Sequence, residues 1–90
     1  MSHEVTLDSL LEDLHGVDKE IQGYEKKYKL LSHYFLPLYE AGILEENRDF
    51  GDWAALLDMR IRRIEKFKMF LPQALSTMPV NGNLKSTVLA

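Results

Sequence analysis

A stripe of apolar side chains, spaced by alternating steps of three and four residues, runs from Leu7 to Leu38 and constrains the fold more than any other feature. The average step of 3.5 residues keeps the stripe on one face of a gently supercoiled helix. Thr6 precedes the stripe and can cap the helix through its hydroxyl. Gly16 and Gly23 lie inside this predicted helix. Each destabilises the helix by about 1 kcal/mol relative to alanine, which is too little to overturn the pattern. The stripe consists of Leu7, Leu10, Leu14, Val17, Ile21, Tyr24, Tyr28, Leu31, Phe35 and Leu38.

The far end of this stripe carries signals for a break. Pro37 has no N–H to donate into a helix, and Ser32 can cap a fresh one. We therefore expect a break or kink between Leu30 and Leu36, followed by a short helix that ends near Ala41. Gly42 is a suitable terminator just beyond that end.

A second long helix is predicted from Phe50 to about Leu71. The residues from Ile43 to Arg48 form the connection, and Asp49 is the expected N-cap. Pro72 ends this helix or kinks its last turn. The apolar positions follow a helical spacing, at Phe50, Trp53, Ala54, Leu57, Ile61, Ile64, Phe67 and Leu71.

The order of the charges favours an antiparallel hairpin. The first helix begins acidic and then carries a lysine cluster in residues 26–29, whereas the last helix begins acidic and ends basic. An antiparallel arrangement places the acidic start of the first helix beside the basic end of the last. It also brings the lysine cluster near Asp49, Asp52 and Asp58. Exposed ion pairs contribute well under 1 kcal/mol each, so these charges select orientation more than they stabilise.

These features predict an all-α fold, an antiparallel helical hairpin of two long helices and a short middle helix. A 90-residue chain forms one domain, which we place at residues 1–75, and the turn formers beyond it indicate a flexible C-terminal tail at residues 76–90. A two-helix hairpin has a thin core. A second copy would complete a four-helix bundle, so we expect a homodimer, and a different protein could cover the same surface.

Composition limits the compartment and the partners. The chain has no cysteine, which excludes disulfides and thiolate metal sites and suits a cytoplasmic protein. The N-terminus lacks the basic and apolar regions of a secretory signal, and no apolar run approaches the length that a membrane helix needs. The net charge of −3 argues against a protein that binds nucleic acid through its whole surface.

The residues suggest no catalytic or cofactor chemistry. Glu12 and His15 form an E-x-x-H pair, a spacing found in di-iron bundles. The heptad places both on the outer face, and a metal site in a bundle core needs inward ligands. No serine or histidine has the surroundings of a catalytic triad, and no phosphate-binding loop is present. We therefore expect no enzyme activity, no metal and no cofactor.

Residues 60–68 form the one basic patch, in which Arg60, Arg62 and Arg63 are candidate contacts for a partner. The alternative function that follows is a small nucleic-acid-binding regulator. The competing interpretation is that the patch is a solvated helix face whose charges pair with those of the acidic first helix. No aromatic side chain is interleaved on the polar side to stack on bases.

Aromatic residues cluster in the middle of the chain, which is the turn end of a hairpin. They can fill the core beside a broken helix. Alternatively, Tyr34, Tyr39 and Trp53 can anchor a partner, because Tyr and Trp are favoured at interface hot spots. Both interpretations hold together in an obligate oligomer.

Residues 35–44 and 49–59 resemble a group of small prokaryotic helical proteins with the pattern Y-x-x-G-x-L followed by D-F-x-[DE]-W-A-x-L. The resemblance covers roughly a quarter of the chain. That group is associated with toxin–antitoxin gene pairs, so the resemblance implies a protein that binds and neutralises a partner toxin. Pro37 and the long heptad stripe before it depart from the pattern. The signature residues are Tyr39, Gly42, Leu44, Phe50, Trp53 and Ala54.

Overall fold

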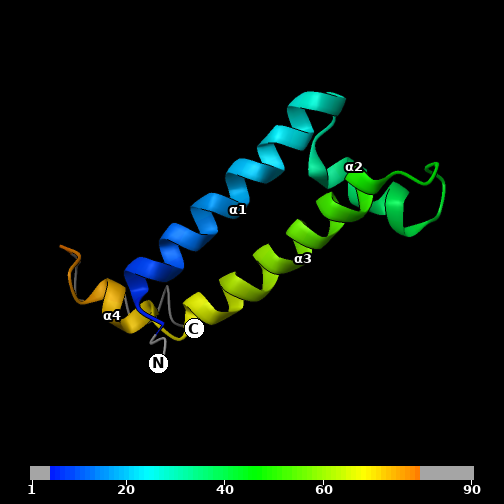
Figure 1. The fold of residues 1–90 in the computed structure, drawn as a ribbon. Coiled ribbons are helices and arrows are strands. Elements are labelled where there is room, and N and C mark those ends of the chain that lie inside the picture. The colour runs from blue at the N-terminus through cyan, green and yellow to red at the C-terminus, as the bar shows by residue number, and fades with distance from the viewer. Residues whose placement is uncertain (1–4, 80–90) are drawn as a thin grey trace, which may run out of the picture.

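The computed structural model describes residues 5–79, in which helices account for 76% of the residues and no strand occurs. The elements are α1 (Leu7–Tyr28), α2 (Ser32–Glu40), α3 (Arg48–Lys68) and α4 (Leu71–Leu75) (Figure 1). The predicted all-α class is confirmed. The expected tail lies outside the described residues from position 80 onward. None of the helices in the described part has the length and apolar character needed to cross a bilayer.

The first turn of α1 is closed by a reciprocal cap. The Ser9 amide donates to Thr6 Oγ1 at 3.1 Å, and the Thr6 amide donates to Ser9 Oγ at 3.0 Å. Both amides would otherwise lack partners at the helix start. The prediction that Thr6 caps the first helix is confirmed.

The long stripe breaks slightly earlier than predicted, after Tyr28 rather than beyond Leu30. Lys29 adopts the left-handed conformation, with φ 53° and ψ 43°, and α2 begins three residues later. Ser32 does not cap α2, because its amide and hydroxyl both donate to Glu25 Oε2 at 2.8 Å. A side chain of α1 therefore anchors the start of α2.

The other helix ends also differ in part from the prediction. Pro37 lies inside α2, which continues to Glu40, and Gly42 turns the chain with φ 72° as expected of a terminator. The N-cap of α3 is Asn47, whose side chain accepts from the Asp49 amide at 2.8 Å, so the assignment of Asp49 as N-cap was wrong. The helix ends at Lys68, and the next short helix, α4, contains Pro72 in its first turn.

The hairpin core is a thin seam between α1 and α3, which lie side by side and run in opposite directions (Figure 1). At mid-length, Val17 and Ile21 of α1 pack with Leu56 of α3. Phe35 of α2 packs on α3 at the turn end. The predicted antiparallel hairpin with a short middle helix agrees with this arrangement. The buried side chains of the described part are Leu10, Val17, Ile21, Phe35, Trp53 and Leu56.

Candidate interaction surfaces

Trp53 lies in the aromatic core and is 0% exposed. Its ring stacks on Phe35, with centroids 3.7 Å apart and planes inclined by 4°. The indole N–H donates to Ser32 Oγ at 2.9 Å, so the polar edge of the ring is also satisfied. For this residue the structure favours the core interpretation, because a partner cannot reach the ring.

Tyr34 and Tyr39 remain at the surface of α2. Tyr34 is 59% exposed and makes an edge contact with the His33 ring. Tyr39 is 39% exposed and packs one side of its ring on Phe35, with centroids 5.6 Å apart. Both tyrosines therefore offer an aromatic face at the turn end of the hairpin.

Asp49 links the first turn of α3 to the end of α1. Lys27 Nζ and the Tyr28 hydroxyl both donate to Asp49 Oδ2, each at 2.6 Å. The hydrogen bond from Lys27, followed by the one from Tyr28, lowers the pKa of the Asp49 carboxyl. Contact with Asp49 raises the pKa of Lys27 and the pKa of Tyr28. The charge order predicted that the lysine cluster containing Lys27 lies near Asp49. It did not predict the hydrogen bond of Tyr28 to Asp49, because Tyr28 was assigned only to the apolar stripe.

Two ion pairs join the acidic start of α1 to the basic end of α3. Arg60 Nε donates to Asp18 Oδ1 at 2.6 Å, and Arg63 donates to Asp13. They are the contacts that the charge order predicts for an antiparallel hairpin.

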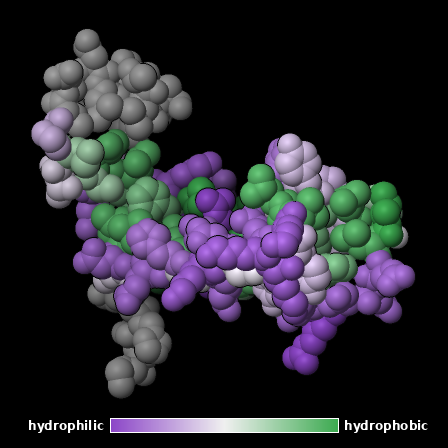
Figure 2. Space-filling model, turned by 90° about the horizontal axis from the view of Figure 1, so that it is seen from above, coloured by the Kyte–Doolittle hydropathy of each residue, from purple (hydrophilic) through white to green (hydrophobic). Residues whose placement is uncertain are grey.

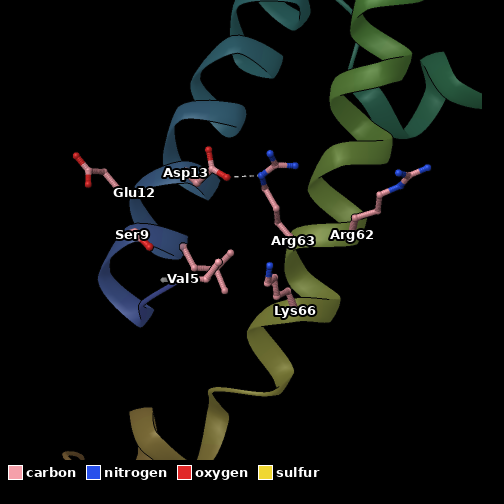
Figure 3. A pocket seen from close by; sticks show the side chains of 8 residues that line it. Val5, Ser9, Glu12, Asp13, Arg62, Arg63 and Lys66 are labelled. Carbon is pink, nitrogen blue, oxygen red and sulfur yellow. Dashed lines mark hydrogen bonds and ion pairs between the residues drawn. The ribbon is translucent and has the colours of Figure 1, made fainter. Parts of the chain in front are cut away.

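Arg62 and Lys66 complete the lining of a cleft between the first turns of α1 and the last turns of α3. In Figure 3 the pair of Asp13 and Arg63 crosses this cleft, whereas Arg62 points away from α1. Arg62 pairs within its own helix, with Asp58 at 3.0 Å. All three candidate arginines therefore have acidic partners. The pairs of Arg60 and Arg63 favour the interpretation of residues 60–68 as a helix face that pairs with the acidic first helix, whereas Arg62 pairs within α3.

Two short apolar stripes lie beside the buried core. One lies on α1 and the other on α3, and in each the spacing i, i+4, i+7 places the side chains on one side of the helix. The α1 stripe and Leu57 are half-buried, whereas Ile61 is 56% and Ile64 is 36% exposed. We name them together the open apolar face, which consists of Leu7, Leu11, Leu14, Leu57, Ile61 and Ile64.

The ion pair between Asp18 and Arg60 shows that the two stripes share one side of the hairpin. Asp18 follows Leu14 by one helical turn, so it continues the α1 stripe. Arg60 lies between Leu57 and Ile64 on α3, one turn from each. Because the two charged side chains meet, the stripes lie on either side of a common seam.

The start of α2 covers the continuation of this side toward the turn end. Glu25 lies two helical turns beyond Asp18 on α1, and its carboxylate accepts both hydrogen bonds from Ser32. The contacts of α2 with α3 lie near Trp53, at the turn end. The open apolar face lies on the same side of the hairpin, toward the first turns of α1 and the last turns of α3.

Potential metal-ligating side chains are scattered over the described residues. Within residues 5–79, no three histidine, aspartate or glutamate side chains come together in a way that could hold a metal ion. Glu12 and His15 are both exposed, as the heptad predicts.

The chain matches no protein-family model, no curated protein and no solved structure. The resemblance to the toxin–antitoxin group stays a hypothesis that rests on the motif residues. Of these, Trp53 is buried, whereas Tyr39 lies at the surface of the turn end.

Proposed function

We propose that this protein is a non-enzymatic protein–protein interaction module that self-associates and binds a partner protein, in an antitoxin-like or adaptor role. The open apolar face carries the proposal, because six large aliphatic side chains beside the core remain half-buried or exposed in one copy. Neighbouring large apolar side chains that stay accessible in one copy are typical of an interaction site.

The size of the core gives a second reason. Six side chains are buried in the described part, which is a small core for a chain of 90 residues. Domains of this size commonly depend on a staple or on a partner that extends the core. Completing the burial of a half-exposed leucine or isoleucine contributes roughly 1 kcal/mol. An additional layer of helices over the open apolar face would supply several such contributions.

A second copy is the partner that we propose for this face. Two copies related by a two-fold axis would bury the same surface on each other and place four long helices in one bundle. The ion pair between Asp18 and Arg60 lies within the face, and its two charges neutralise each other. Two copies can therefore approach without repulsion between like charges at this pair.

The test is the molar mass of the purified chain over a dilution series, measured by light scattering after size exclusion. We expect a dimer. The Ile61→Glu variant should be a monomer, because the dimer would bury an unpaired carboxylate. Ile61 is 56% exposed in a single copy, so the variant should keep its helical far-UV circular dichroism.

Ile43→Glu is the matched control, since it makes the same substitution at a side chain that is 68% exposed in the loop after α2. We expect this variant to remain a dimer. A wild-type chain that stays a folded monomer at the highest concentration would contradict self-association. If the Ile61→Glu variant is still a dimer, the open apolar face is not the dimer interface.

A further inference from the structure

A second apolar surface lies at the turn end of the hairpin. It is a groove between the end of α2, the loop that follows and the first turns of α3. Tyr39, Leu44 and Phe50 supply its apolar lining, and Gly51 lies beside them. Figure 2 shows hydrophobic residues gathered at this end of the molecule. We name this surface the turn-end groove.

The aromatic core holds the walls of the turn-end groove in place. Tyr39 packs on Phe35 with ring centroids 5.6 Å apart, and Phe50 packs on the same ring at 5.7 Å. Phe50 also meets Tyr28 of α1 edge-on at 5.1 Å. Because Phe35 is itself 0% exposed and stacked on Trp53, the groove is formed before any partner binds. A preformed site loses less conformational entropy on binding.

Gly51 has no side chain to fill the groove, but as a glycine it makes α3 less stable. A glycine inside a helix destabilises it by about 1 kcal/mol relative to alanine. The backbone does not require glycine here, since Gly42 is the glycine of the described part with positive φ. A Cβ at position 51 would meet the Tyr39 hydroxyl at 4.0 Å, an ordinary contact. Neither backbone geometry nor packing within one copy therefore explains the missing side chain.

The rim of the groove carries excess negative charge. Glu45 and Glu46 line it, and Glu40 ends α2 beside it. All three are exposed, and none forms an ion pair with another described residue. Arg48 also lines the groove, but it lies 4.0 Å from Asp52, which offsets its charge. The rim is thus complementary to a basic partner.

We infer that the turn-end groove binds a basic amphipathic segment of a partner protein. An aromatic or aliphatic side chain of the segment packs against Tyr39, Leu44 and Phe50. Lysine or arginine side chains beside this anchor face Glu45 and Glu46. The inference rests on the proposed function, since it names where the partner binds and with what chemistry, and it uses a different surface from self-association.

The probe is a fluorescein-labelled Lys/Leu peptide with one tryptophan anchor that forms an amphipathic helix, titrated by fluorescence anisotropy. Its Glu/Leu counterpart of equal length is the reference peptide. We expect the Lys/Leu peptide to bind and the Glu/Leu peptide not to bind. The double variant Glu45→Lys, Glu46→Lys should weaken binding about tenfold, a loss of about 1.4 kcal/mol.

Two matched controls separate the groove from general effects of charge and helix stability. The double variant Asp8→Lys, Glu12→Lys makes the same change in net charge at the far end of α1 and should bind as the wild type does. Gly51→Leu should fill the groove and weaken binding about tenfold, without a lower melting temperature. Gly16→Leu, whose Cβ would have nothing within 4 Å, should bind normally.

The inference is overturned if the Lys/Leu peptide binds no better than the Glu/Leu peptide. It is also overturned if Gly51→Leu and the Glu45, Glu46 variant both bind as the wild type does. Ile61→Glu distinguishes the two proposals, because it should abolish the dimer and leave peptide binding intact. If the wild type is a dimer that does not bind the peptide, only the proposal for the turn-end groove is refuted. If it is a monomer that binds the peptide, only the proposal of self-association is refuted.

Discussion

Phe35 of α2 lies flat against Trp53 of α3, with ring centroids 3.7 Å apart and an angle of 4° between the ring planes. Both side chains are 0% exposed. Tyr39 and Phe50 in turn pack on Phe35. The stacked pair therefore holds α2 on the hairpin and supports both walls of the turn-end groove.

Phe35→Ala should lower the free energy of unfolding by about 3–5 kcal/mol, because it removes a fully buried ring and leaves a cavity beside Trp53. Urea denaturation followed by far-UV circular dichroism measures the change. Tyr34→Ala is the neighbouring control at a side chain that is 59% exposed, and its effect should stay within about 0.5 kcal/mol. Equal losses in the two variants would contradict the packing of α2 on Trp53.

The stabilisation from Asp49 should depend on pH at both ends of the scale. The pKa of Asp49 is lowered in the folded chain, so its contribution is present above the ordinary value of 3.8 and is lost as the pH falls through the folded pKa. The pKa values of Lys27 and Tyr28 are raised. Their contributions are therefore present below the ordinary values of 10.5 and 10.0 and are lost as the pH rises through the folded values.

The measurement is the difference in unfolding free energy between the wild type and Asp49→Asn across a pH series. We expect the wild type to be the more stable near neutral pH, with a difference that narrows in acid and in strong base. A difference that is constant from acid to base would show that the carboxylate contributes no charge-dependent contact.

Gly16→Ala and Gly23→Ala should each raise the free energy of unfolding by about 1 kcal/mol. Both positions lie inside α1, and an added Cβ would meet nothing within 4 Å. Gly42→Ala is the opposite case, because φ is 72° there, and it should lower stability by about 1 kcal/mol. Thermal melts of the three variants test the signs, and destabilisation by either α1 substitution would indicate that another backbone approaches that face.

Lys29→Gly should raise stability by about 1 kcal/mol, since Lys29 is the non-glycine residue of the described part with positive φ. Glycine adopts the left-handed conformation without the steric cost of a Cβ. The comparison variant Lys29→Val should be less stable than the wild type in the same melts. The reverse order would mean that α1 continues past Tyr28 in solution.

The helical class and the antiparallel direction of the two long helices follow from patterns that are visible in the sequence alone. The heptad spacing requires one helix face to be buried, and it is local enough to be recognised without a partner segment. Thr6 and Gly42 act through their own backbone neighbours, so their roles as cap and terminator were also predictable. The blocks of charge predicted that the lysine cluster lies near Asp49 and that the acidic start of the first helix lies beside the basic end of the last. The pairs of Lys27 with Asp49 and of Arg60 with Asp18 agree with this arrangement.

The position of the break in the long stripe and the accessibility of the aromatic residues depend on contacts between helices. The periodicity continues through Lys29, so the break there depends on Glu25, which binds Ser32, and on the stacking of Phe35 on Trp53. Asp49 is likewise engaged by Lys27 and Tyr28, while Asn47 caps α3. Lys27 and Tyr28 contact Asp49, and Phe35 contacts Trp53, across different helices, while Ser32 contacts Glu25 across the chain reversal. No local spacing reveals these contacts. The same packing buries Trp53 and leaves Tyr39 at the surface.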